Sequence, residues 1–199
     1  MMTSAGIGQT DLGVGLVSIK FDDKTVLRFY DKLSDKTPAK TIEFFDDKSI
    51  NSWNIRDLNE NGKWLSPESL WLDYYFFVFR CKSKNPSGFE VIVNNDTGKT
   101  FWLKRSTATV FKTWGKYLQG MFAVERSGEF KQKIYANPGV RAREINFKGN
   151  DCFEVRSMIG EWIQISTASH CENVITKLNS GWIRWRKGNR LLVSYFPTS

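Results

Sequence analysis

Short stretches in which apolar and polar residues alternate follow one another along most of the 199-residue chain. A period of two is the pattern of β-strands with one buried face. It predicts strands over residues 14–20, 25–30, 41–45, 74–80, 88–94, 99–104, 121–126, 131–135, 142–147, 152–158, 161–166, 181–185 and 190–195. Many short strands at close spacing favour a barrel or a sandwich over a parallel sheet.

Three segments depart from this strand pattern. Apolar residues at positions 110, 111, 114, 117 and 118 share one face of a helix that is predicted to begin at Ser106 and end at Gly120. Ser66, Pro67 and Glu68 supply an N-cap, a first-turn proline and a first-turn acid, which predicts a short second helix. The polar, asparagine-rich residues 46–63 are predicted to form a long loop.

The composition and charge of the chain indicate a folded protein with an uneven surface. Hydrophobic residues make up 41% and aromatic residues 15%, which is too much apolar material for disorder. The net charge is +8, but residues 1–100 carry 13 basic and 14 acidic residues, so the positive charge lies in the second half. This asymmetry favours an anionic partner there, either nucleic acid, a membrane or cell-wall polymer, or an acidic protein. The alternative is a solvated basic surface without a specific partner.

Three cysteines are too few for a disulfide scaffold. If one bridge forms, we expect it between Cys152 and Cys171, which leaves Cys81 as a buried thiol in an apolar run. Residues 1–9 resemble the end of a secretory signal, with the small-x-small triplet at 6–8, although the charged start and apolar core are missing. An exported, periplasmic location is therefore expected, with a frayed cytoplasmic terminus as the alternative. The sequence has no apolar run long enough to span a membrane.

The two halves of the chain show a weak internal repeat. Residues 27–31 match 133–137, residues 88–93 match 160–165, and residues 101–103 match 181–183. The second copy contains the motifs IYANPG at 134–139, FKGND at 147–151, GEWIQI at 160–165 and GWI at 181–183. With these motifs it resembles the bacterial Src-homology-3-like domain, over about residues 128–196 and more weakly over residues 20–105. The loop at residues 167–180 is long for that family.

The resemblance implies small five-stranded barrels with a binding role, often as accessories of cell-envelope proteins, and it names no ligand. The expected fold is mainly β, with two small Src-homology-3-like barrels in tandem. The first has a long inserted loop and is followed by one amphipathic helix. The expected division is residues 1–12 as a signal remnant or frayed terminus, 13–127 as the first barrel and 128–199 as the second.

No catalytic or metal-binding constellation can be assembled from the residues. His170 is the single histidine, and its neighbour Cys171 would face the opposite way on a strand. Cys152, His170 and Cys171 offer zinc three ligands without a CxxC motif. The acidic pairs at 22–23 and 46–47 are predicted to lie in solvated turns. We therefore expect no enzyme, no metal and no cofactor.

The most suggestive segment is residues 182–190, which interleaves four cations with two tryptophans. Strand alternation places Trp182, Arg184 and Arg186 on one face and Trp185 on the other. Rings and guanidinium groups together suit a carboxylate or a phosphate. The alternative is a hairpin with one tryptophan in the core and its arginines in solvent.

Two functions from different classes fit these residues. The first is a non-catalytic, exported or envelope-associated module that binds a peptide, a cell-wall glycan or a partner protein. Its expected contact surface is a groove lined by Tyr135, Trp162 and Trp182, next to Arg184, Trp185 and Arg186. The second is a basic β-barrel that binds single-stranded nucleic acid in the cytoplasm, with an affinity that falls steeply with salt.

Overall fold

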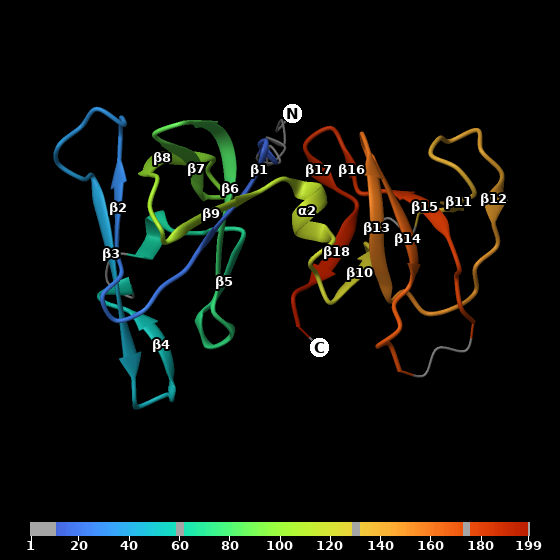
Figure 1. The fold of residues 1–199 in the computed structure, drawn as a ribbon, viewed down its shortest axis with the longest axis horizontal. Coiled ribbons are helices and arrows are strands. Elements are labelled where there is room, and N and C mark those ends of the chain that lie inside the picture. Colours follow the sequence, from blue (N-terminus) through green and yellow to red (C-terminus); the bar gives the residue numbers. More distant parts are fainter. Residues whose placement is uncertain (1–10, 59–61, 129–131, 173–175, 199) are drawn as a thin grey trace, which may run out of the picture. The chain divides into compact units, whose positions relative to one another are not determined.

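The chain folds into two units, both mainly β, each with a curled, half-barrel sheet (Figure 1). The computed structural model describes residues 11–58, 62–128, 132–172 and 176–198. The signal-like residues 1–9 lie outside the described residues. Unit 1 is Met1–Thr113 and unit 2 is Trp114–Ser199. The division lies earlier than the expected boundary after residue 127, because residues 123–126 pair with strands of unit 2.

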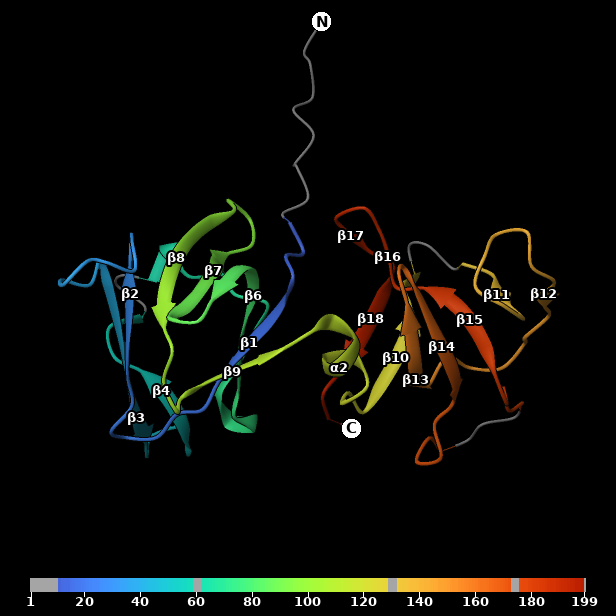
Figure 2. The same ribbon diagram turned by 45° about the horizontal axis from the view of Figure 1, so that its top comes forward.

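The sheet of unit 1 is antiparallel and, among the described residues, has nine strands in the order β4-β3-β2-β8-β7-β6-β1-β9, with β5 on β6. Figure 2 shows β6, β7 and β8 next to one another. The strands are β1 (Gly15–Ile19), β2 (Val26–Tyr30), β3 (Lys40–Asp47), β4 (Ser52–Ile55), β5 (Ser69–Trp71), β6 (Phe76–Asn85), β7 (Gly88–Asn94), β8 (Lys99–Lys104) and β9 (Thr109–Lys112). Two 3₁₀ turns, η1 (Gly62–Trp64) and η2 (Leu72–Tyr74), precede and follow β5 along the chain.

The core of unit 1 is filled by phenylalanine rings from the concave side of this sheet. Phe29, Phe77, Phe79 and Phe89 are fully buried. Phe29 meets Phe79 edge to face with ring centres 5.7 Å apart, and Phe77 meets Phe79 in a tilted arrangement at 4.7 Å; such ring pairs add to the gain from burial. At the edge of the core, Gly13 has a φ of +66°, and a Cβ there would lie 2.1 Å from the carbonyl oxygen of Cys81. Only glycine fits where the chain enters β1.

Unit 2 is a second antiparallel sheet, with seven strands in its described part in the order β12-β11-β15-β14-β13-β10-β18. A short helix, α2 (Trp114–Leu118), packs on β13, and a two-stranded ribbon, β16–β17, stands apart from the sheet. Figure 2 shows β13, β14 and β15 running side by side. The strands are β10 (Ala123–Arg126), β11 (Ile134–Tyr135), β12 (Glu144–Ile145), β13 (Phe153–Ile159), β14 (Trp162–Thr167), β15 (Gly181–Arg184), β16 (Arg186–Lys187), β17 (Arg190–Leu191) and β18 (Val193–Phe196).

Period-two alternation accounts for the core of unit 2. In β14, Ile163 and Ile165 are fully buried while Trp162 and Gln164 are half-buried on the other face. Gly181 begins β15 where a Cβ would lie 2.4 Å from the Ile134 side chain, so β11 and β15 approach closely there. Cys152 and Cys171 form a disulfide that joins residues on either side of β13 and β14. Closing a loop of this length contributes on the order of 3 kcal/mol.

The helix predicted from Ser106 to Gly120 is wrong in its first half. Residues 109–112 form β9, which pairs with β1 through Leu16 opposite Lys112 and Val17 opposite Phe111. The helix itself is limited to Trp114–Leu118. The apolar side chains before Trp114 complete the edge of one sheet, and those from Trp114 onward pack within unit 2.

The short helix predicted at Ser66 is also wrong. The Ser66 N–H donates to the Val93 carbonyl at 2.8 Å, and the segment continues into β5, which pairs with β6. Part of the predicted loop at residues 46–63 is likewise a strand, since β4 pairs with β3 through a turn at Asn51. The hairpin predicted over residues 88–104 is confirmed, with Gly98 at a φ of +72° in its turn.

Candidate ligand-binding surface

The outer face of β11, β15 and β14 brings together most of the predicted ligand-binding residues. In the antiparallel register Trp162 lies opposite Arg184, and Tyr135 lies opposite Trp182. Residues directly opposite in neighbouring strands project from the same side of a sheet. The spacing of two along β15 therefore places Tyr135, Trp162, Trp182 and Arg184 on one face.

Three of these side chains form a stack at the surface. The Arg184 guanidinium lies 5.1 Å from the centre of the Trp162 ring, which is the distance of a cation–π contact. Tyr135 meets the same indole edge to face, with ring centres 5.6 Å apart. All three residues are half-buried. We refer to Tyr135, Trp162 and Arg184 as the aromatic–arginine face.

Arg184 carries a positive charge that no carboxylate of the described residues neutralises. No carboxylate among the described residues lies within ion-pair distance of its guanidinium. Its Nε is buried and has no hydrogen-bond acceptor in the part of the chain that the structure describes. A buried polar group without a partner is costly, and the half-buried side chain keeps an unneutralised positive charge at this face.

Two of the predicted site tryptophans are not available to a ligand. Trp182 is 8% exposed and Trp185 is 3% exposed. The Trp185 indole Nε1 donates to the Gly160 carbonyl at 3.0 Å, and its ring packs on Trp114. The predicted groove therefore reduces to the aromatic–arginine face, and Trp185 is a core residue whose hydrogen bond is internal.

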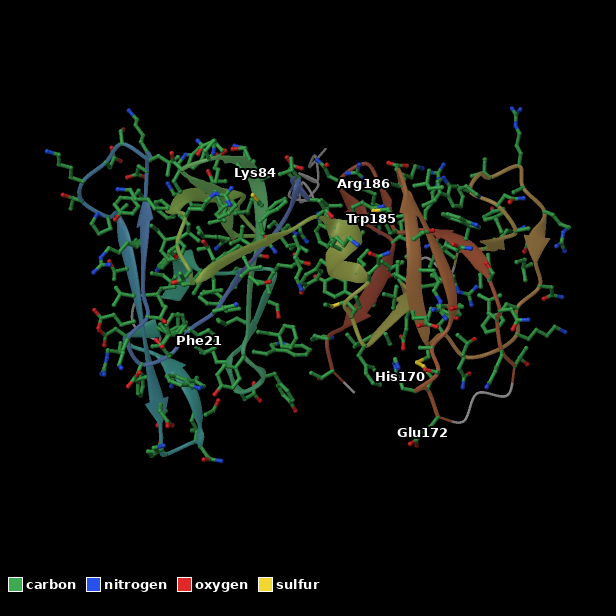
Figure 3. The ribbon with its side chains drawn as sticks, in the orientation of Figure 1. Phe21, Lys84, His170, Glu172, Trp185 and Arg186 are labelled. Atoms are coloured by element: carbon green, nitrogen blue, oxygen red, sulfur yellow. A yellow bond between two sulfur atoms is a disulfide. The ribbon has the colours of Figure 1, made fainter. Side chains whose placement is uncertain are left out.

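Arg186 also has no carboxylate within ion-pair distance among the described residues. Its guanidinium lies 4.9 Å from the Trp185 ring, and Figure 3 shows the two residues together. It lies in the β16–β17 ribbon, whose turn is held by the Gly188 N–H donating to Glu161 at 3.2 Å. Arg186 shields Trp185 and keeps a positive charge at the end of β15.

Gln132 fixes the backbone of Arg184. Its Oε1 accepts a hydrogen bond from the Arg184 N–H at 2.9 Å, and its Nε2 donates to the Arg184 carbonyl at 2.6 Å. The Gln132 carbonyl in turn accepts from Arg126, which is paired with Asp151. Sequence analysis missed Gln132 because the contact joins residues 52 positions apart and no local pattern marks it.

The residues considered for catalysis are occupied by structural contacts. His170 Nε2 lies 2.7 Å from the Phe122 carbonyl oxygen, and its neighbour Cys171 is in the disulfide (Figure 3). Burial raises the pKa of the Cys81 thiol to about 12, so it carries no thiolate at neutral pH. Hydrogen bonds from Thr25 and Ser49 lower the pKa values of Asp22 and Asp47, which makes both poor proton donors.

The described residues offer no metal site, because no three metal-ligating side chains gather among them. In the same part of the chain, the helices are too short and too polar to cross a membrane. Comparison of the chain with protein-family models, with curated proteins and with solved structures yields no match.

Proposed function

We propose that the chain is a non-enzymatic, exported binding protein whose unit 2 recognises a carboxylate-bearing cell-wall glycopeptide. The observation that carries the proposal is the uncompensated Arg184 guanidinium stacked on Trp162. An arginine held in this way presents its planar donors to a carboxylate, and the adjacent rings offer faces to a sugar or a peptide. Unit 2 adds long-range attraction, because residues 114–199 carry 13 basic and 7 acidic residues.

Two further observations support export and the relationship to Src-homology-3-like domains. The disulfide between Cys152 and Cys171 is typical of proteins in an oxidising compartment. The GEWIQI and GWI motifs form β14 and β15, two neighbouring strands that carry the aromatic–arginine face. We propose that each unit is a modified Src-homology-3-like barrel and that the second has kept its binding face.

Replacing Arg184 with alanine is expected to raise the Kd for a muramyl peptide about tenfold or more. A hydrogen bond to a charged group contributes about 1.5–3 kcal/mol, and the truncation also uncovers Trp162. Tryptophan fluorescence of the full chain, titrated with the muramyl peptide at moderate salt, measures the change. Trp162→Ala is expected to weaken binding to a similar degree.

Arg156→Ala is the matched control, since Arg156 is an exposed arginine of the same sheet that is already paired with Glu154. Its Kd is expected to equal that of the parent chain. Binding that survives both Arg184→Ala and Trp162→Ala unchanged, or saturable binding that is absent altogether, would overturn the assignment of the ligand to this face.

Single-stranded nucleic acid is the second candidate, favoured by the two adjacent cations of β16, Arg186 and Lys187. Arg186 has no carboxylate partner within the described residues, and Lys187 is exposed beside it. A single-stranded oligonucleotide titrated in the same assay distinguishes this function. Quenching that is saturable at low salt and collapses as salt rises identifies counterion release and replaces the glycopeptide proposal.

A further inference from the structure

Unit 1 carries a group of exposed aromatic rings at the turn between β5 and β6, far along the chain from the aromatic–arginine face. Trp71, Tyr74 and Tyr75 are 47%, 54% and 61% exposed. Trp53 of β4 is half-buried and joins them through its contact with Tyr75. We call Trp53, Trp71, Tyr74 and Tyr75 the turn aromatic surface. Large rings this exposed on a folded chain mark a surface that contacts something else.

The rings of this surface are held in place. The Trp53 indole Nε1 donates to the Tyr75 hydroxyl at 2.8 Å. The Tyr75 ring stacks on Phe21, with centres 5.6 Å apart, and Figure 3 shows Phe21 at the same end of unit 1 as β4. Trp71 and Tyr74 meet edge to face at 6.5 Å. The surface is thus organised before any ligand arrives, which reduces the entropy lost on binding.

Tyr75 adopts a backbone conformation that its side chain disfavours. Its φ of 59° and ψ of 28° are left-handed, and its N–H donates to the Leu72 carbonyl to end η2. Glycine or asparagine satisfies such a turn with less strain. A bulky aromatic residue in this position points to a function of the ring, because strained residues of this kind gather at functional sites.

The faces of these rings are open to cations. Eight lysine or arginine side chains of the described chain lie over aromatic rings, on both units. None of them covers a ring of the turn aromatic surface. The rings that the chain's own cations cover are buried or half-buried, and the exposed rings of the turn aromatic surface are not among them.

Carboxylates border the same rings. Asp73 is exposed between Leu72 and Tyr74, whereas Asp46, directly opposite Trp53 in the β3–β4 pair, is already paired with Lys48. Asp22 follows Phe21, and the hydrogen bond from Thr25 lowers its pKa, so it is ionised at neutral pH. The negative faces of the rings and these carboxylates attract the same sign of charge.

We propose that the turn aromatic surface binds a basic peptide segment, whose lysine ammonium or arginine guanidinium groups stack on the open rings. Cation–π contact supplies the attraction at the rings, and Asp73 pairs with a neighbouring cation of the segment. This surface is distinct from the aromatic–arginine face in both position and sign of charge. The chain would then hold an anionic ligand on unit 2 and a cationic partner on unit 1.

The experiment titrates the full chain with tetralysine amide, tetraarginine amide and a tetralysine amide acetylated on every side chain. We expect saturable binding of the two cationic peptides and none of the acetylated one, because acetylation removes the charge and leaves the backbone. Trp71→Ala and Tyr74→Ala are each expected to raise the Kd at least fivefold. Both rings are exposed, so a circular dichroism spectrum equal to that of the parent is expected for each variant.

Tyr75→Gly separates the ring from the turn. Glycine keeps the left-handed conformation and removes the ring with its contacts to Phe21 and Trp53, so the variant is expected to lose affinity for tetralysine while its circular dichroism spectrum stays equal to that of the parent. Asp73→Asn is expected to weaken binding, and Asp96→Asn, an exposed acid in the β7–β8 turn of the same unit, is expected to leave it unchanged. Trp162→Ala in unit 2 is also expected to leave tetralysine binding unchanged.

Several outcomes overturn the proposal. Equal binding of the acetylated and unmodified peptides shows that charge is not recognised. Tetralysine binding that survives the double variant Trp71→Ala/Tyr74→Ala places the contact elsewhere. Binding of an uncharged oligosaccharide such as cellohexaose in place of the cationic peptides identifies a glycan surface, and binding of none of these probes leaves the surface without the proposed function. Because Trp162→Ala is scored with both probes, failure here is distinguishable from failure of the glycopeptide proposal.

Discussion

Replacing Asp151 with alanine is expected to lower the free energy of unfolding by about 3–5 kcal/mol. The two Asp151 carboxylate oxygens accept hydrogen bonds from Arg126 Nη2 at 2.6 Å and Nε at 2.7 Å, and Oδ2 also accepts the Arg126 backbone N–H at 3.0 Å. The two side chains are only 8% and 12% exposed. The variant therefore leaves an arginine charge buried without its counterion. Urea unfolding of the full chain, followed by far-ultraviolet circular dichroism, measures the loss.

The exposed pair Lys133–Glu144 is the natural comparison, because it joins the residue before β11 to β12 of the same unit at 2.6 Å with side chains 63% and 47% exposed. Solvent screens such a pair, so Glu144→Ala is expected to change stability by at most about 1 kcal/mol. Equal losses in Asp151→Ala and Glu144→Ala would mean that burial of the Arg126–Asp151 pair does not determine its contribution.

Replacing Phe29 with alanine is expected to cost about 3–5 kcal/mol, the usual range for a fully buried ring. Phe29 has no exposed surface and meets the rings of Trp64, Phe79 and Phe101, with centres 5.3, 5.7 and 6.4 Å away. The alanine variant removes the ring that these three side chains, which come from η1, β6 and β8, share as a contact. Urea unfolding of purified Phe29→Ala provides the measurement.

Phe29→Leu tests whether the lost side-chain volume causes the loss of stability in Phe29→Ala. Leucine keeps most of the apolar contact, so its cost is expected to be clearly smaller, in the range of about 1–2 kcal/mol. A Phe29→Ala variant as stable as the parent would indicate that neighbouring rings collapse into the cavity, which the edge-to-face packing around Phe29 argues against.

Local pattern predicted the fold where local contacts decide it. Residues 88–94 and 99–104 are two short apolar runs joined by a turn with glycine, and they form β7 and β8 with those bounds. The prediction failed over residues 106–113, where Val110 and Phe111 fit a helical stripe and a strand equally well. Pairing with β1, about 90 residues earlier in the chain, decides between them, and no window of sequence contains that information.

The aromatic–arginine face could likewise be predicted only where local contacts decide the structure. The period of two correctly predicted that Trp162 and Gln164 lie on one face of β14 and that Ile163 and Ile165 lie on the other. It gave no indication that Trp182, on the outer face, would be buried, nor that Gln132 would hold the backbone of Arg184. Both depend on residues distant in the sequence that the fold brings together.

The state of the three cysteines provides an intrinsic chemical probe for the opening of unit 1. Cys152 and Cys171 are consumed by their bridge, so Cys81 is the single free thiol. It lies in β6 with no exposed surface, and burial holds its pKa at about 12. An alkylating reagent therefore has one target in the whole chain, and it reaches that target only when β6 and its neighbours separate. The rate of alkylation of the unmodified protein then reports how often unit 1 opens, with no engineered label.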